Sequence, residues 1–220
     1  MRMKITDAIV GVDYSMSCPT ICILADDLTF ANSQFYFLSS RKRDLSISWK
    51  NIHGIEHDGV YSSEIERFNQ ISIPLIGVLQ ELLKQGKKIK VFIEGYSMGS
   101  KGKVFNIAEN TAVFKLKLHY LKIPYVEVAP TQNKKNFSGK GNANKDVMYE
   151  AFKAQGHPDI IGFYQKSGTK VGSPVGDIVD AYSLALYGHA SETGTLTKRE
   201  APEAAKKKKT SLTLKPDQKA

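Results

Sequence analysis

The chain has 220 residues, of which 41% are hydrophobic, so it can bury one substantial core or form a single domain with a tail. Its formal net charge of +9 favours a polyanionic partner, although charge alone does not separate nucleic acid from a membrane surface. No stretch approaches the roughly 20 apolar residues of a membrane span, so we expect a cytoplasmic protein with no membrane partner.

In chain order, the sequence predicts an α/β fold with a mixed five-stranded sheet flanked by helices. Apolar, β-branched runs of strand length lie at residues 7–13, 19–26, 28–40, 88–95 and 125–130. Helical periodicity lies at residues 62–86, 105–122, 144–155 and 177–190. Residues 41–61 and 157–175 are polar and aperiodic, and a Gly- and Lys-rich segment follows residue 130, so we expect loops in all three places.

The composition changes near residue 191. Residues 191–220 contain no aromatic side chain and include the lysine run 206–209. Such a segment cannot bury enough apolar surface to order itself. We therefore expect one folded domain over residues 1–190 and a disordered basic tail over residues 191–220.

The helix expected at residues 105–122 has two apolar stripes. One stripe includes Phe114 and Leu118, and the other includes Phe105 and Leu116. A helix with two apolar faces is buried on its sheet and also against something else. We expect that second contact to be another subunit.

The last predicted helix carries Asp177 and Asp180 near its start. Acids at a helix start are typical of capping, because they accept backbone N–H bonds and favour the positive end of the helix dipole. However, both acids share a helical face with Leu184 and Tyr187, so they continue the buried stripe. Two like charges at a half-buried position repel each other, and this arrangement needs a compensating charge.

Two further acids end predicted strands, Asp13 after residues 7–12 and Glu94 near the end of residues 88–95. Strand ends in α/β sheets are where functional groups gather, so we expect these acids to meet the last helix at one edge. Four carboxylates suit hard divalent cations, which would also neutralise the cluster. Each acid also has a simpler explanation, a turn cap for Asp13 and a lysine pair for Glu94.

Four segments, in this order, carry a family resemblance: "IVGVDYS", "VFIEG", "VAPTQNKKNFSGKGNANKDV" and "GDIVDAYSLAL". Together they resemble the RuvC-type Holliday junction resolvases of the RNase H-like superfamily. The longest match runs from Pro130 to Lys145 and is similar to the family pattern Pro-Thr-Gln-x-Lys, Gly-x-Gly, Ala-x-Lys. The resemblance covers about residues 7–190. It implies an RNase H-like nuclease domain and a homodimer whose two sites cut opposed strands of a four-way junction.

The resemblance also implies two Mg²⁺ ions per active site, with Mn²⁺ as a substitute. The catalytic residues would be Asp13, Glu94, Asp177, Asp180 and Lys145, and the four acids would be the metal ligands. The DNA-binding residues would be Lys134, Lys135, Lys140, Lys145, Tyr96 and Met98. Tyr96 and Met98 lie slightly out of register with the family's aromatic residue that wedges into the junction, so junction opening and substrate selectivity are expected to differ.

From these features we expect a Mg²⁺-dependent endodeoxyribonuclease that cleaves Holliday junctions and other branched DNA by two-metal phosphodiester hydrolysis. One alternative is a related RNase H-like nuclease acting on flaps, forks or RNA–DNA hybrids. Another is a non-catalytic junction-binding scaffold. Compact size, the lysine tail and sequence divergence favour a bacteriophage-encoded protein, which would act in the host cytoplasm.

The segment 41–61 contains three further features. The stretch "RKR" at residues 41–43 is a basic patch, for which phosphate contact and plain solvation are equally open. The stretch "HGIEH" lacks the Glu directly after the first His that zinc proteases need, so we expect a surface loop. Trp49 is expected to anchor the segment.

Overall fold

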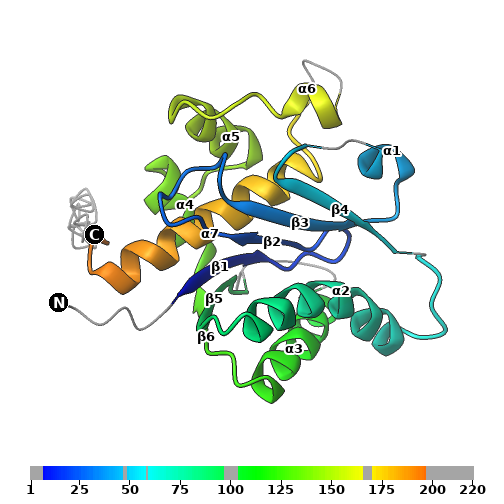
Figure 1. The fold of residues 1–220 in the computed structure, drawn as a ribbon. Helices are drawn as coiled ribbons and strands as arrows, with labels where there is room; N and C mark the ends of the chain where they lie inside the picture. The colour runs from blue at the N-terminus through cyan, green and yellow to red at the C-terminus, as the bar shows by residue number, and fades with distance from the viewer. Residues whose placement is uncertain (1–6, 47–48, 58, 97–103, 166–169, 197–220) are drawn as a thin grey trace, which may run out of the picture.

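The structure is a computed structural model that describes residues 7–46, 49–57, 59–96, 104–165 and 170–196. The strands are β1 (Ala8–Asp13), β2 (Thr20–Ile23), β3 (Gln34–Ser39), β4 (Ile52–Glu56), β5 (Ile89–Glu94) and β6 (Tyr125–Val128). The helices are α1 (Lys42–Leu45), α2 (Glu64–Lys84), α3 (Val104–Tyr120), α4 (Pro130–Ser138), α5 (Lys145–Ala154), α6 (Ile161–Tyr164) and α7 (Val175–Thr193). The strands form one mixed sheet with helices on both faces, so the predicted α/β class is confirmed (Figure 1).

The strand directions bring five strand ends to one edge of the sheet. The strand order is β4-β3-β2-β1-β5-β6, and β2 runs antiparallel to both of its neighbours. The pairs β1–β5, β5–β6 and β3–β4 are parallel. The carboxyl ends of β1, β3, β4, β5 and β6 therefore lie at the same edge, which we call the carboxyl edge.

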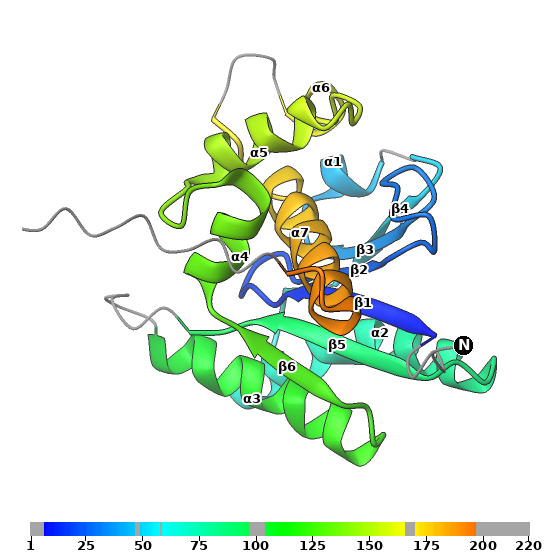
Figure 2. The ribbon, with the colours of Figure 1, turned by 90° about the vertical axis from the view of Figure 1, so that its left-hand side faces the viewer.

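Helices cover the sheet on both faces and enclose two separate apolar cores (Figure 2). On one face, α7 lies on β1, β2 and β5, and α4 and α5 pack against α7. The core on this side is rich in aromatic residues, including Phe35, Phe37 and Tyr182. On the other face, α2 and α3 cover aliphatic residues such as Val12 and Ile93. Because both faces are buried, β1 and β5 are largely apolar, with Lys90 as the exception inside β5.

The structure has six strands where the sequence predicted five. The additional strand, β4, lies at one edge of the sheet, inside the segment that was expected to be a loop. Ile52 is its one fully buried residue, so its apolar signal in the sequence is weak. Because β4 contains His53, the surface-loop prediction for "HGIEH" was also wrong. Trp49 contacts Phe163 of α6, with ring centroids 4.4 Å apart, and links two insertions.

The Gly- and Lys-rich segment after β6 begins with a helix, α4, where the sequence predicted a loop. Pro130 occupies its first turn, and Gly139 ends it with a left-handed backbone at φ 78°. The segment is largely polar, and Asn133 is its one buried residue. An apolar stripe is therefore missing, and helical periodicity could not reveal this helix.

The longer helices follow their sequence signals closely. Ser63 caps α2 by accepting a hydrogen bond from the Glu66 backbone, and α2 continues through Pro74. On α3, one apolar stripe is buried at Phe114 and Leu118. The second stripe faces outward, since Phe105 is 82% and Leu116 is 50% exposed.

The described part of the chain ends shortly after α7. This helix continues to Thr193, and Gly194 follows with φ 70°. Residues 197–220 lie outside the described residues, so the disordered basic tail stays a prediction. Within the described ranges, we find no helix whose length and hydropathy would let it cross a bilayer.

Gly11 allows α7 to lie directly on the central strand. A Cβ atom at Gly11 would stand 2.1 Å from the Ala181 carbonyl oxygen and 2.4 Å from the Ala185 nitrogen. Both atoms belong to the backbone of α7 and cannot rotate away. Nearer its C-terminus, α7 approaches the sheet closely a second time, since a Cβ at Gly188 would lie 2.3 Å from the Phe92 ring of β5. Glycine at these positions therefore sets how closely the helix approaches the sheet.

We expect Gly11→Ala to push α7 away from β1 and to lower the free energy of unfolding by about 2–3 kcal/mol. The matched control is Gly77→Ala in α2, where an added Cβ meets no atom within 4 Å. This control should raise stability by about 0.5–1 kcal/mol or leave it unchanged, because alanine favours helix. Urea denaturation followed by circular dichroism measures both, and wild-type stability in Gly11→Ala would contradict the close contact.

Candidate active site at the carboxyl edge

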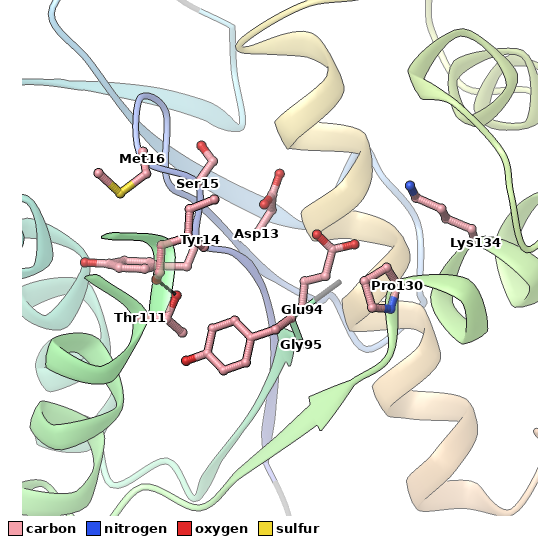
Figure 3. A pocket seen from close by; sticks show the side chains of 11 residues that line it. Asp13, Tyr14, Ser15, Met16, Glu94, Gly95, Thr111, Pro130 and Lys134 are labelled. Atoms are coloured by element: carbon pink, nitrogen blue, oxygen red, sulfur yellow. Dashed lines mark hydrogen bonds between the residues drawn. The ribbon is translucent and has the colours of Figure 1, made fainter. Parts of the chain in front are cut away.

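Two neighbouring central strands end in acids at the carboxyl edge. Asp13 is the last residue of β1, and Glu94 is the last residue of β5. The parallel register pairs Val12 with Ile93, so the acids that follow them leave the sheet side by side. Figure 3 shows both side chains directed into the same space beside α7, with Lys134 approaching from α4.

The first turns of α7 bring two more acids to this place. The side chains of Asp177 and Asp180 are buried, with 1% and 9% of their surface exposed. All four acids line one cavity of about 230 Å³. The charged residues that line it are Asp13, Glu94, Asp177, Asp180, Lys134 and Lys145. The structure thus brings together every acid that the sequence singled out, and two of the lysines.

Asp177 does not cap its helix, so the capping interpretation was wrong for this residue. The N-cap of α7 is Pro174, and no side chain caps the first turn. The Asp177 Oδ1 atom instead accepts a hydrogen bond from Lys145 Nζ at 2.7 Å. Its Oδ2 atom is buried and has no hydrogen-bond partner in the described part of the chain. The carboxylate therefore keeps one acceptor unsatisfied inside the protein.

Lys145 enters the cluster from the start of α5. Asn144 caps this helix by accepting a hydrogen bond from the Val147 backbone, which fixes Lys145 as the first helical residue. Gly176 leaves room for the lysine stem, because a Cβ there would lie 2.7 Å from Lys145 Cδ. Although burial lowers it, the Asp177 carboxylate raises the pKa of Lys145 above its usual value. The ammonium group therefore stays charged and offsets part of the acid cluster.

Burial raises the pKa of three acids above the ordinary range for carboxyl groups. Burial and then the Asp177 charge hold the pKa of Asp13 well above its usual value. Burial also raises the pKa of Glu94, although nearby lysines oppose the change. The pKa of Asp180 rises to about 7, because the group is buried and faces Glu94. Without a cation, the cavity therefore favours the protonated forms of these three acids over their charged forms.

Hydrogen bonds between α4 and α7 fix the position of Lys134. The Asn133 side chain donates to Ser183 Oγ at 2.8 Å, and this hydroxyl donates to the Asp180 carbonyl oxygen at 2.8 Å. Lys134, one residue after Asn133, lines the acid cavity. Lys135 also lies on α4 and is partly exposed, whereas Lys140 follows the helix and is exposed.

A second cavity, of about 340 Å³, adjoins the acid cluster and shares Asp13, Glu94 and Lys134 with it (Figure 3). Sequence reasoning missed several of the residues that line the two cavities. Ser15 lines both, and it follows the strand-end acid by two residues, so the same signal could have found it. Thr111 comes from a helix whose orientation the sequence alone does not fix.

Tyr96 contacts α3 and lines the second cavity. Its hydroxyl donates to the Ala108 carbonyl oxygen at 3.4 Å, and Lys115 Nζ lies 4.7 Å from its ring centroid. The side chain is 37% exposed. Tyr96 is therefore held against its own subunit. Met98 lies outside the described residues.

The acid cluster suits a divalent cation in donor type, but the side chains do not converge on one ion. Within the described ranges, no group of three or more His, Cys, Asp or Glu side chains has the spacing to hold a metal. The unsatisfied Asp177 Oδ2 atom and the raised pKa values of Asp13 and Asp180 show that the protein alone compensates the charged form of the cluster only in part. A hard cation with oxygen ligands would neutralise that charge. The residues therefore fit a divalent cation in chemistry and burial.

No protein-family model matches the sequence, and no curated protein matches it. Among solved structures, Thermus thermophilus RuvC matches 86% of this chain and 97% of that chain, at 14% identity and a TM-score of 0.51. The chain has the RuvC fold. Thermus thermophilus RuvC in complex with a Holliday junction substrate matches 86% of this chain and 96% of that chain, at 12% identity and a TM-score of 0.49. Fowlpox virus resolvase in complex with Holliday junction DNA matches 84% of this chain and 98% of that chain, at 12% identity and a TM-score of 0.41.

The RuvC fold assignment rests on the first of these matches together with the mixed sheet and its flanking helices. It confirms the RNase H-like fold that the sequence motifs predicted. In this RuvC-like fold, the acid cluster lies where β1 and β5 meet the start of α7.

The raised pKa of Asp180 predicts that the metal-free protein loses stability as pH rises. In the folded protein Asp180 keeps its proton up to about pH 7, whereas its ordinary pKa is 3.8. The folded state therefore binds more protons than the unfolded state between these values, and stability falls across this range. We expect Asp180→Asn to be more stable than wild type by about 1–3 kcal/mol at neutral to basic pH, with the difference shrinking toward about pH 4.

Denaturation in EDTA across this pH range measures the difference. Glu150→Gln on α5 is the control, because this carboxylate is 70% exposed, and we expect no pH-dependent change for it. Added Mg²⁺ should stabilise the wild type more than Asp180→Asn. A stability difference that stays constant with pH would contradict the buried charge at Asp180.

Proposed function

We propose that this chain is a divalent-metal-dependent nuclease that cleaves Holliday junctions and other branched DNA. The observation that carries the proposal is that four carboxylates from β1, β5 and α7 line one cavity at the carboxyl edge of a RuvC-like sheet, three of them buried and Glu94 half-buried. The net charge of +9 and the lysines in the cavity support a phosphate-containing substrate. The motif resemblance supports branched DNA as the substrate class.

Asp13, Glu94 and Asp180 would be the principal metal ligands, and Asp177 would be an auxiliary one. Two bound Mg²⁺ or Mn²⁺ ions would activate a water, align the phosphodiester and stabilise the leaving oxygen. Lys145 holds the Asp177 carboxylate and keeps a positive charge inside the cavity. A phosphate entering the cavity would meet this charge, which attracts the phosphate and helps to orient it.

One observation favours the alternative substrates, which are flaps, forks and RNA–DNA hybrids. A residue that wedges into a junction must be free to leave its own subunit, but Tyr96 contacts α3 and Lys115. If Tyr96 keeps this position, the site would favour branched substrates whose strands are already separated. We therefore keep these substrates as a second candidate.

We further propose that the protein is a homodimer joined through α3 and β6. Apolar side chains on this flank face outward, with Phe105, Leu116 and Tyr120 exposed by 82%, 50% and 74%. The neighbouring strand β6 is the edge of the sheet, and its first three residues are exposed. A second copy would cover both features, and two active sites are needed to cut two opposed strands.

Cleavage assays test the nuclease proposal. Wild type with Mg²⁺ should cleave a labelled four-way junction and should not cleave it in EDTA. Asp13→Asn and Asp180→Asn should lower the rate by about two orders of magnitude or more while retaining DNA binding. Glu150→Gln, a distant exposed carboxylate, should cleave as wild type does. Unchanged cleavage by Asp180→Asn would exclude the proposed ligand set.

The same cleavage assay is then repeated with forks, flaps and RNA–DNA hybrids as substrates. Faster cleavage of these substrates than of the four-way junction would favour the second candidate. If the protein binds these substrates but cleaves none of them with Mg²⁺ or Mn²⁺ present, the remaining interpretation is a non-catalytic junction-binding scaffold.

Leu116→Glu tests the dimer, because a charge in the proposed interface should oppose association. We expect wild type to sediment as a dimer and Leu116→Glu to shift toward monomer by at least about tenfold in dissociation constant. Ile65→Glu is the matched control, since Ile65 is also exposed, by 63%, but lies on α2. A monomeric wild type, or equal effects of the two changes, would argue against the α3–β6 interface.

A further inference from the structure

A basic segment stands at the carboxyl edge, on the flank of the sheet away from β6. β3 ends at Ser39, and the chain turns there into α1. Because β1 and β3 both end at this edge, Arg41, Lys42 and Arg43 lie on the same side of the sheet as Asp13. Figure 1 shows α1 beyond β3 and β4, near the start of α7. The proposed catalytic chemistry and the proposed dimer use none of these three side chains.

A buried carboxylate orients Arg41 and lies near Arg43. Asp44 is fully buried, and its Oδ2 atom accepts hydrogen bonds from Arg41 Nε at 2.6 Å and from Ser39 Oγ at 2.9 Å. Arg43 Nη2 lies 3.8 Å from Asp44 Oδ1. An arginine that is already oriented loses less conformational freedom when it binds an anion.

The same arginines keep their charge at the surface. The side chain of Arg41 is 51% exposed, that of Arg43 is 63% exposed, and Lys42 is exposed between them. Arg41 Nη2 also donates to the Ser173 carbonyl oxygen at 2.6 Å, just before α7 begins. The basic segment is therefore linked to the helix that carries Asp177 and Asp180, and its guanidinium groups remain accessible to a partner.

We propose that Arg41 and Arg43 bind backbone phosphates of the duplex arm that leaves the acid cluster across β3 and β4. This α1 arginine site rests on the proposed nuclease function and adds a contact outside the crossover. The acid cluster repels phosphates, so cations around it must hold the DNA. The oriented guanidinium group of Arg41 and the exposed one of Arg43 supply that attraction at the same edge, in the planar geometry that suits phosphate.

Arg43 is the better residue for testing this site. Arg41 has a structural contact through the Ser173 carbonyl oxygen, so its loss could also disturb the start of α7. Arg43 has a longer contact with Asp44, at 3.8 Å, and a more exposed side chain. Arg43→Ala should therefore fold with wild-type thermal stability, and Arg43→Lys keeps the charge.

Fluorescence anisotropy with a labelled four-way junction, in EDTA, measures binding without cleavage. We expect Arg43→Ala to raise Kd roughly tenfold and to reduce the slope of log affinity against log salt by about one. Arg41→Ala/Arg43→Ala should raise Kd and reduce the salt slope further, and Arg43→Lys should keep the salt slope. Lys87→Ala is the control, because this exposed lysine precedes β5 at the opposite edge of the sheet. The Lys87→Ala protein should bind the junction with wild-type affinity.

A second four-way junction has arms shortened so that little duplex extends beyond the crossover. It tests whether Arg43 contacts an arm or the crossover itself. On this substrate Arg43→Ala and wild type should bind equally. An equal loss on short and long arms would overturn the assignment to an arm, and wild-type affinity in a folded Arg43→Ala would overturn the site. If wild type cleaves no branched DNA but Arg43→Ala still weakens long-arm binding, the nuclease proposal fails and the arginine site stands. If wild type cleaves branched DNA and Arg43→Ala binds it with wild-type affinity, the arginine site fails and the nuclease proposal stands.

Discussion

The backbone contact between α7 and β1 determines where every charged group of the site can lie. Because Gly11 has no side chain, the Ala181 carbonyl group rests against the central strand. Asp177 and Asp180 lie in the helical turns just before this contact, so they reach the end of β1 where Asp13 emerges. A helix held farther away by a larger residue would separate the two pairs of acids. The cluster therefore follows from a packing constraint as much as from the identities of the acids.

This packing creates an electrostatic problem that the protein alone solves only in part. Burial raises the pKa values of Asp13, Glu94 and Asp180, and Lys145 compensates chiefly at Asp177. A structural cluster would be expected to pair each carboxylate, because unpaired buried charges cost several kcal/mol. The remaining negative charge instead suits an added cation.

The sequence predicted the fold class and the acids that lie at the carboxyl edge, but it missed several elements around them. Asp13 and Glu94 could be recognised as candidate site residues because each ends an apolar run. The buried position of Asp180 followed from the helical face that it shares with apolar residues. The strand β4 was missed because one of its residues, Ile52, is fully buried, and α4 was missed because its one buried residue, Asn133, is polar. The contact that holds Asp177 was also missed, since its lysine partner lies 32 residues away in the chain and depends on tertiary packing.

The two flanks of the sheet differ in a way that links the proposals. Beyond β5, the outer surface of α3 and β6 is apolar, whereas beyond β2 the carboxyl edge carries Arg41 and Arg43. Two copies joined through the apolar flank would place their arginines at the outer ends of the assembly. Phosphates near the acids would then be held by Lys134 and Lys145, and the outgoing duplex would be held by the arginines. Two lysines would thus balance part of the charge inside each cavity while the arginines retain the DNA outside it, so that Asp13, Glu94 and Asp180 stay available to a cation.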